Sequence, residues 1–265
     1  MVVGLGLGLS GKHTAGTNMA LKNNKSLGQH WLKDRTILDQ ISELLTGNLV
    51  LEIGPGLGTL TSSLLRRFDK VIAVEYDRRL AENLPKSFPG KNLVVVHQDF
   101  LQYDLTQIKE PYVVAGNIPY YITSPIINKL LETENRPARI VLLIQKEVAD
   151  RILALDGKES VLSLTVKNRA KVTPGFIVPK SFFTPPPKVD SAVIIMDPLA
   201  KPQVSEQVIN LMKVGFKNPR KKLIKNLPYE QDALESAFSA LKIDKNARPA
   251  DLSLEQWQKL LNFLA

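Results

Sequence analysis

Five short apolar runs recur between residues 49 and 144, and they constrain the fold more than any other feature of the chain. Almost every residue in each run is apolar, which is typical of strands that are buried on both faces, as in a parallel sheet. The runs are Leu49–Ile53, Val71–Val74, Leu93–Val96, Tyr112–Ala115 and Ile140–Ile144. Helical patterns separate them, so the sequence predicts an α/β fold with a mainly parallel sheet, right-handed crossovers and helices on both faces.

The first run leads into a glycine-rich turn, Gly54-Pro55-Gly56-Leu57-Gly58. Glycines between a strand and a helix let a ligand approach the backbone, whose N–H groups are ready donors. A dinucleotide fingerprint requires G-x-G-x-x-G, but Thr59 occupies the position of the third glycine. The turn, with Gly54 and Gly56, therefore suits a cofactor whose amino-acid end, and not a pyrophosphate, meets the loop.

Acidic residues follow the next two runs. Glu75 ends the second run, about twenty residues after the glycines, where a carboxylate can accept hydrogen bonds from two ribose hydroxyls. Asp99 follows the third run and can accept a hydrogen bond from an adenine amino group, with Phe100 covering the ring. Taken singly, Glu75 can be a solvated strand end and Asp99 an ordinary turn residue. Together with the glycine turn, they predict a nucleoside pocket along successive strand ends.

The segment Asn117-Ile118-Pro119-Tyr120 follows the fourth run. The side-chain oxygen of Asn117 and the carbonyl of Ile118 can both accept hydrogen bonds from one exocyclic amino group, while the ring of Tyr120 lies flat on the heterocycle. This segment therefore predicts a site for a planar base. The alternative is an ordinary strand-to-helix turn, in which Asn and Pro are common.

Ahead of the first run, Gln29 and His30 stand between a glycine and the Trp31-Leu32 pair. One interpretation is a segment folded over the cofactor, with both polar side chains pointing toward it. The other is that His30 merely caps or packs. Residues 1–22 are glycine-rich and lack the basic start of a signal peptide, so we expect a disordered leader without a function.

The composition of the chain restricts the classes of partner that it can bind. With 265 residues, the chain is long enough for one large domain and a small one. A net charge of +9 favours an anionic partner, nucleic acid before membrane, because no apolar run approaches the roughly 20 residues of a bilayer span. The chain has no cysteine and only 3 scattered histidines, so we expect no disulfide, no metal site and a cytoplasmic location.

After Met196 the pattern becomes helical, and Pro198 and Pro202 indicate a linker. We therefore expect three parts, namely the leader, a cofactor-binding domain at residues 23–197 and a small all-helical domain at residues 198–265. The helices are expected at Val204–Phe216, Lys221–Leu227, Gln231–Leu241 and Leu254–Phe263. A cluster of basic residues in this domain suits a phosphate-binding surface that does not read sequence, although such a run is often only a solvated face. Its predicted RNA-binding members are Lys217, Arg220, Lys221, Lys222 and Lys225.

Seven motifs in register resemble the ribosomal RNA adenine dimethyltransferases that use S-adenosylmethionine, most closely the bacterial small-subunit group. They are KSLGQHWL, EIGPGLGTLT, VEYD, QDFLQYD, NIPYYITSP, QKEVADRI and FFTPPPKVDSAVI. The resemblance covers Lys25 to Leu264, and it implies a Rossmann-like class I methyltransferase sheet.

The resemblance also implies roles for individual residues. Asn117 and Tyr120 would be the catalytic pair, and Phe183 would close the other face of the target base, in preference to its neighbour Phe182. His30 stands where the family often has asparagine. The implied cofactor site consists of His30, Leu32, Gly54, Glu75, Asp99 and Asn117, to which the pattern of the residues adds Gln29 and Gly56.

The expected function is S-adenosylmethionine-dependent dimethylation of adjacent adenosines near the 3′ end of small-subunit ribosomal RNA. The expected partner is this RNA within an assembly intermediate of the small subunit. We expect the protein to be a monomer and to have no membrane partner. Two alternatives stay open, namely a large-subunit dimethylase of the antibiotic-resistance type and a non-catalytic RNA-binding assembly factor. A small-molecule methyltransferase fits the basic helical domain less well.

Overall fold

The five predicted strands form the centre of a seven-stranded sheet with the order β4-β3-β2-β5-β6-β9-β7. The structure is a computed structural model that describes residues 30–265. Strands β2 to β6 pair in parallel, whereas β9 runs antiparallel between β6 and β7. The predicted α/β fold with a mainly parallel sheet is confirmed. The strands are β2 (Leu49–Ile53), β3 (Lys70–Glu75), β4 (Leu93–His97), β5 (Tyr112–Asn117), β6 (Ile140–Gln145), β7 (Ala170–Val178) and β9 (Ser191–Pro198).

Helices cover both faces because the strand residues alternate between two apolar clusters. On β2, Leu51 belongs to one cluster and Val50 to the other. Side chains of α1 and α2 pack in the cluster of Val50, and those of α4, α5 and α6 pack in the cluster of Leu51. The helices are α1 (Arg35–Glu43), α2 (Thr59–Leu64), α3 (Arg78–Ser87), α4 (Thr123–Glu132), α5 (Lys146–Leu153) and α6 (Val161–Arg169).

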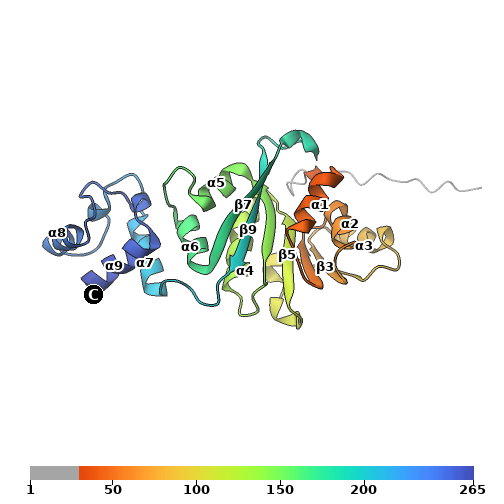
Figure 1. Cartoon of the computed structure of the whole chain (residues 1–265), viewed down its shortest axis with the longest axis horizontal. Helices are drawn as coiled ribbons and strands as arrows, with labels where there is room; N and C mark the ends of the chain where they lie inside the picture. Colours follow the sequence, from red (N-terminus) through yellow and green to blue (C-terminus); the bar gives the residue numbers. More distant parts are fainter. Residues whose placement is uncertain (1–29) are drawn as a thin grey trace, which may run out of the picture.

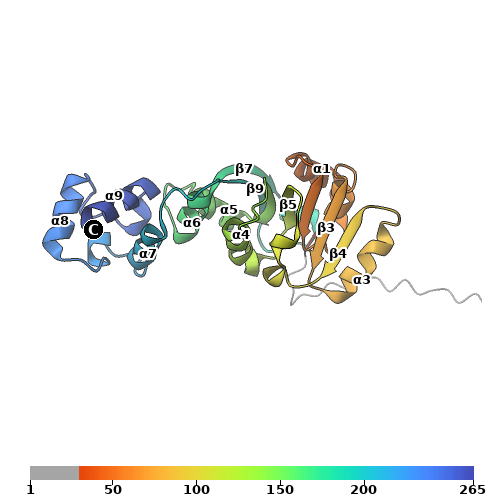
Figure 2. The ribbon, with the colours of Figure 1, turned by 90° about the horizontal axis from the view of Figure 1, so that it is seen from below.

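The last part of the chain forms a helical unit at one end of the long axis (Figures 1 and 2). It consists of α7 (Glu206–Gly215), α8 (Gln231–Ala240) and α9 (Leu254–Leu264) around the fully buried Trp257 and Phe238. Leu164 of α6 belongs to the same apolar cluster, so the sheet domain contributes to the core of this unit. The division of the chain at residue 198 stays a prediction.

One predicted helix is wrong. The segment Lys221–Leu227 forms only a single 3-10 turn, η6 (Leu223–Lys225). Pro228 follows Leu227, and a proline disfavours the helical conformation of the residue before it.

Short elements connect the strand ends to the helices. They are η2 (Phe100–Gln102), η3 (Leu105–Gln107), η4 (Tyr120–Ile122), η5 (Lys180–Phe182), η7 (Pro249–Asp251) and the paired strands β1 (Trp31–Leu32) and β8 (Phe183–Thr184). Within residues 30–265, no helix is long and apolar enough to cross a membrane. The expected leader, residues 1–22, and Gln29 lie outside the described residues.

Candidate functional site

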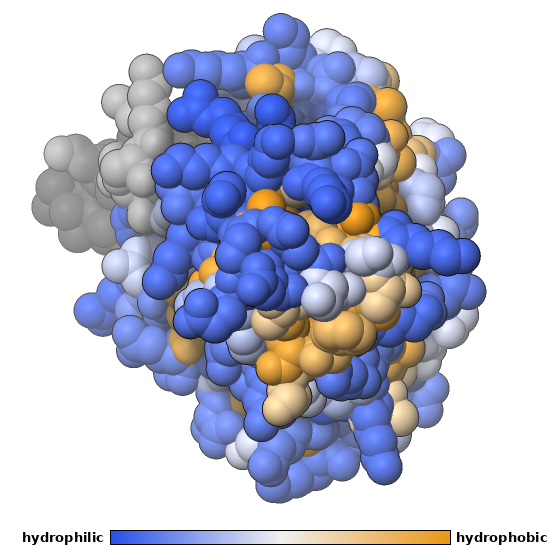
Figure 3. Space-filling view, turned by 90° about the vertical axis from the view of Figure 1, so that its left-hand side faces the viewer, coloured by the Kyte–Doolittle hydropathy of each residue, from blue (hydrophilic) through white to orange (hydrophobic). Residues whose placement is uncertain are grey.

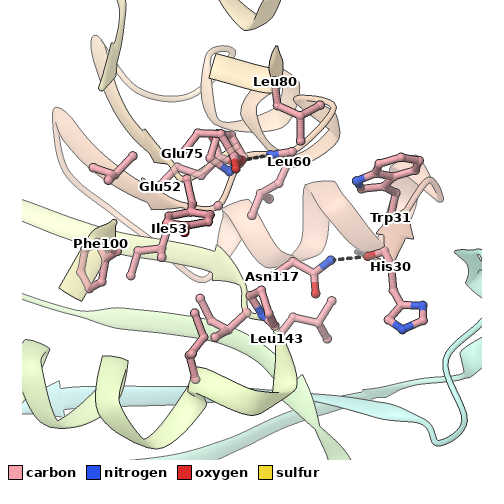
Figure 4. A pocket seen from close by; sticks show the side chains of 18 of the residues that line it. His30, Trp31, Glu52, Ile53, Leu60, Glu75, Leu80, Phe100, Asn117 and Leu143 are labelled. Carbon is pink, nitrogen blue, oxygen red and sulfur yellow. Dashed lines mark hydrogen bonds between the residues drawn. The ribbon is translucent and has the colours of Figure 1, made fainter. Parts of the chain in front are cut away.

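A cavity of about 330 Å³ opens at the carboxyl ends of β2, β3 and β5 and beside the turn after β4 (Figure 4). Ligands bind at this edge of open α/β sheets because the strand-to-helix turns there leave backbone and side-chain groups exposed. The cavity brings together most of the predicted cofactor residues. Those that line it are His30, Leu32, Gly54, Gly56, Glu75, Asp99 and Asn117.

Asn117 ends β5, and its amide group is oriented by the backbone of another segment. The Nδ2 atom of Asn117 donates a hydrogen bond to the carbonyl oxygen of His30 at 3.0 Å (Figure 4). A carbonyl oxygen can only accept, so the amide nitrogen must face His30. The Oδ1 atom of Asn117 is thereby left as an acceptor on the wall of the cavity.

The segment that orients Asn117 is itself held by the loop around β8. Strands β1 and β8 pair antiparallel, with Leu32 opposite Phe183. The Nδ1 atom of His30 lies 2.8 Å from the carbonyl oxygen of Pro185, to which it donates. His30 thus contributes its backbone to Asn117 and its imidazole to the β8 loop.

The glycine turn presents backbone to the cavity. Gly54 and Gly56 have φ of +62° and +59°, a conformation that L side chains rarely adopt. A Cβ atom on Gly54 would meet no heavy atom within 4 Å, so this side of the turn is open. A ligand can therefore approach the backbone at Gly54 closely.

Glu75 is oriented by two backbone donors. Its Oε1 atom accepts from the N–H of Asp77 at 2.8 Å, and its Oε2 atom accepts from the N–H of Gly56 at 3.0 Å. The side chain is buried, and burial is the main cause that raises its pKa above the ordinary value. Each carboxylate oxygen has a second lone pair, so both can still accept from a pair of hydroxyl groups.

Asp99 and Phe100 line the cavity beyond Glu75. The Oδ1 atom of Asp99 accepts from the N–H of Leu101 at 2.9 Å and caps η2. Asp99 is therefore a turn residue and a cavity residue at once. The ring of Phe100 is buried, with the Nζ atom of Lys129 at 5.9 Å from its centroid.

Glu52 also lines the cavity, although it is not among the residues predicted from the sequence. Its side chain is 1% exposed, and its Oε2 atom accepts a hydrogen bond from the Oγ1 atom of Thr61 at 2.6 Å. Burial raises the pKa of Glu52 to about 8. The signal in the sequence was a single charged residue within an otherwise apolar strand.

Phe183, which was expected to cover the target base, is buried in the core of this structure, and its role at the base stays a prediction. The pairing with β1 turns Phe183 and Leu32 to the same face, where both are buried in the core at 3% and 1% exposure. The neighbouring Phe182, the second candidate from the sequence, is 39% exposed. Sequence position alone does not show which of two adjacent aromatic residues is buried and which is exposed.

Two further aromatic residues line the mouth of the cavity. They are Tyr76, after β3, and Tyr121, in η4, and they are 61% and 62% exposed. Neither is among the site residues predicted from the sequence. Tyr120 opens η4 directly after Pro119, but its side chain is outside what the structure describes.

The groups around the cavity could hold a nucleoside that carries an amino-acid chain. Glu75 could accept from ribose hydroxyls and Asp99 from an adenine amino group, and the open backbone at Gly54 could meet the chain. Within residues 30–265, no group of three or more His, Cys, Asp or Glu residues can hold a metal ion.

The basic cluster lies in the helical unit, between α7 and the end of η6. Lys217, Arg220, Lys221, Lys222 and Lys225 are all exposed, and no salt bridge within residues 30–265 involves them. Figure 1 shows the helical unit at the opposite end of the molecule from α1 and α2. Figure 3 shows that hydrophilic residues cover most of this end, around a small apolar area.

Comparisons with known proteins agree on one family. The profile described as ribosomal RNA adenine dimethylase matches residues 20–265. A protein of Nostoc sp. named ribosomal RNA small subunit methyltransferase A is 42% identical, over 92% of this chain and 98% of its own. A protein of the same name from Fusobacterium nucleatum is 37% identical, over 92% and 98%.

Solved structures give the same result. The 23S rRNA methyltransferase ErmE superposes with a TM-score of 0.75 at 30% identity, over 88% of this chain and 99% of its own. A dimethyladenosine transferase from Plasmodium falciparum superposes with a TM-score of 0.74 at 31% identity, over 88% and 96%.

The buried Glu52 leads to a prediction about pH and stability. Its pKa is raised from 4.5 to about 8 in the folded protein, so folding favours the protonated form. The stability that the protonated carboxyl group contributes is complete below about pH 4.5. It is lost as the pH rises through about 8, at up to about 1.4 kcal/mol per pH unit. Since glutamine does not titrate, the free energy of unfolding of the wild type should fall relative to that of Glu52→Gln over this range. Urea denaturation at several pH values measures the free energy of unfolding of both proteins. A difference in this free energy between wild type and variant that stays constant with pH would contradict the raised pKa.

Proposed function

The chain belongs to the ribosomal RNA adenine dimethylase family, and from this premise we propose that it dimethylates adjacent adenosines near the 3′ end of small-subunit ribosomal RNA. The methyl donor is S-adenosylmethionine. The observation that carries the proposal is the acceptor of Asn117, which is held at the wall of a nucleoside-sized cavity by the backbone of His30. The relatives named for the small subunit are 42% and 37% identical to this chain, against 30% for the 23S rRNA methyltransferase ErmE, which favours this target over the large subunit.

The cofactor would be held along the strand ends. We assign the ribose to Glu75, the adenine to Asp99 and Phe100, and the amino-acid end to the open backbone at Gly54 and Gly56, with Leu32 and His30 closing the far side. When bound, the cofactor supplies an electrophilic methyl group on a sulfonium. The protein therefore has to orient the nucleophile rather than activate the donor.

Asn117 orients that nucleophile. The lone pair of an adenine amino nitrogen is delocalised into the ring, which makes the nitrogen a poor nucleophile. Hydrogen bonds from its two hydrogens to the Oδ1 atom of Asn117 and the carbonyl of Ile118 favour a more pyramidal nitrogen, with the lone pair aimed at the methyl carbon. The proton can leave to solvent after transfer, so no strong base is needed.

The target base would lie between two aromatic residues after it has left its stack. We assign one face to Tyr120. For the other face we propose Phe182, because Phe183 is in the core and Phe182 is the exposed aromatic residue of the same loop. Stacking of this kind returns part of the cost of extruding a base.

The basic cluster would bind phosphates away from the cavity, so that one structured RNA spans both ends of the protein. Such a reach suits ribosomal RNA within an assembly intermediate rather than a short free RNA. We further propose that the protein acts as a monomer in the cytoplasm, where ribosomal subunits assemble.

The function is tested by mapping methylated adenosines after incubation with small and large ribosomal subunits that lack the modification. We expect dimethyladenosine at adjacent positions near the 3′ end of the small-subunit RNA. Asn117→Ala should lower the transfer rate by about 100-fold or more, since an oriented polar contact to the reacting group is lost, and weaken cofactor binding only partly. Modification of the large subunit instead, or RNA binding without any transfer, would favour one of the alternatives.

The two phenylalanines of the β8 loop are expected to behave differently. Phe182→Ala should lower transfer to RNA by about tenfold through lost stacking and leave the free energy of unfolding nearly unchanged. Phe183→Ala, the matched variant, should instead lower the free energy of unfolding by about 3 kcal/mol, because it empties a site in the core. Single-turnover kinetics and urea denaturation separate the two effects. A stable Phe183→Ala protein with impaired transfer would return the stacking role to Phe183.

Neutralising Arg220, Lys221 and Lys222 to glutamine should weaken RNA binding and flatten its dependence on salt. The slope of the logarithm of the binding constant against the logarithm of the salt concentration is negative, and its magnitude should decrease by about 0.7 to 0.9 for each phosphate contact that is lost. A control with Arg67, Lys86 and Lys91 changed to glutamine has the same net charge but alters the far side of the sheet domain. Equal slopes in both triple variants would place the RNA surface elsewhere.

A further inference from the structure

The cavity is acidic. Its lining includes the carboxyl groups of Glu52, Glu75 and Asp99, and no lysine or arginine among the described residues. Figure 4 shows Glu52 and Glu75 side by side at one part of the wall. In an otherwise strongly basic protein, such a cavity suits a ligand with positive charge and opposes one with negative charge.

Glu52 differs from the other two acids in what surrounds it. Glu75 accepts from the N–H groups of Gly56 and Asp77, and Asp99 from that of Leu101, whereas both donors to Glu52, a hydroxyl and a backbone N–H, belong to the single residue Thr61. Glu52 is also the most deeply buried of the three, at 1% exposure. A carboxyl group in such a place keeps its proton until a positive charge arrives.

The groups that face Glu52 provide no positive charge. On β3, the aligned residue is Ala73, and the acidic side chain that acts on Glu52 is Glu75. On β5, the aligned residue is Ala115, and on α2 the facing group is the uncharged Thr61. Asp39 of α1 is engaged with Ser63 and Arg66. The raised pKa of Glu52 agrees with this environment.

We propose that Glu52 makes the cofactor site selective for charge, so that it prefers the cationic methyl donor to the product left after transfer. This inference rests on the proposed function of the same cavity. In the transfer, the bond between sulfur and the methyl carbon breaks, the bond between the adenine nitrogen and that carbon forms, and the nitrogen loses a proton to solvent. The donor thereby becomes a neutral thioether.

The consequence is a difference between two ligands that share almost every atom. The sulfonium stabilises the ionised form of Glu52, so binding of the donor releases a proton. The thioether lacks this charge and leaves the proton in place. The same residue therefore favours binding of the donor and departure of the product.

The experiment is titration calorimetry of the full chain without RNA, with S-adenosylmethionine and with S-adenosylhomocysteine, from about pH 6 to about pH 9. Glu52→Gln is the matched variant, because its amide oxygen can still accept from Thr61. Above about pH 8, the variant should lose about tenfold in affinity for the donor and less than about twofold for the product. The amino group of each ligand titrates in both proteins, so the ratio of wild type to variant isolates Glu52.

A second measurement compares proton release in the same two proteins. In two buffers of different ionisation enthalpy at about pH 7, binding of the donor should release more protons from the wild type than from Glu52→Gln, whereas binding of the product should release equal numbers from both. Equal losses of affinity for both ligands in Glu52→Gln, or equal proton release from both proteins with the donor, would overturn the proposal. A wild type that distinguishes the ligands as expected but methylates no ribosomal RNA would contradict the proposed function instead.

Discussion

The hydrogen bond from the amide of Asn117 to the carbonyl of His30 is the contact on which the site depends. An unrestrained asparagine can present either its oxygen or its nitrogen, and only the oxygen can accept from an adenine amino group. The bond selects one of these orientations before any ligand arrives. Because the acceptor is already oriented, it does not have to reorient during the reaction, which is the advantage of a preorganised polar group.

This contact links three parts of the chain that the sheet alone would leave apart. Asn117 comes from the end of β5, His30 from the segment before β1, and Pro185, which holds the imidazole of His30, from the loop after β8. The parallel strands place Gly54, Glu75 and Asn117 at one edge, and the β1–β8 pair lies beside them. The proposed cofactor residues, the proposed catalytic residue Asn117 and the loop after β8 are therefore connected through direct contacts.

Much of this site could be predicted from the sequence, because the carboxyl ends of parallel strands meet at the same edge of a sheet. Once the strands are identified, the residues at their ends follow, namely Gly54, Glu75, Asp99 and Asn117. The contacts between distant segments do not follow. The bond to Asn117 joins residues 87 positions apart, and no local pattern indicates that a backbone carbonyl is its partner. Phe182 and Phe183 are identical residues at adjacent positions, and only the pairing of β8 with β1 determines which one is buried. Glu52 was missed because its chemistry comes from burial, which one charge in an apolar strand indicates only weakly.

The most direct test is a crystal structure of the protein with S-adenosylhomocysteine and a short RNA whose target adenosine has left its stack. We predict the Oδ1 atom of Asn117 at about 3 Å from the exocyclic nitrogen of the base, with the Nδ2 atom still donating to the carbonyl oxygen of His30. An amide that has turned its nitrogen toward the base, or a base bound away from the end of β5, would contradict it.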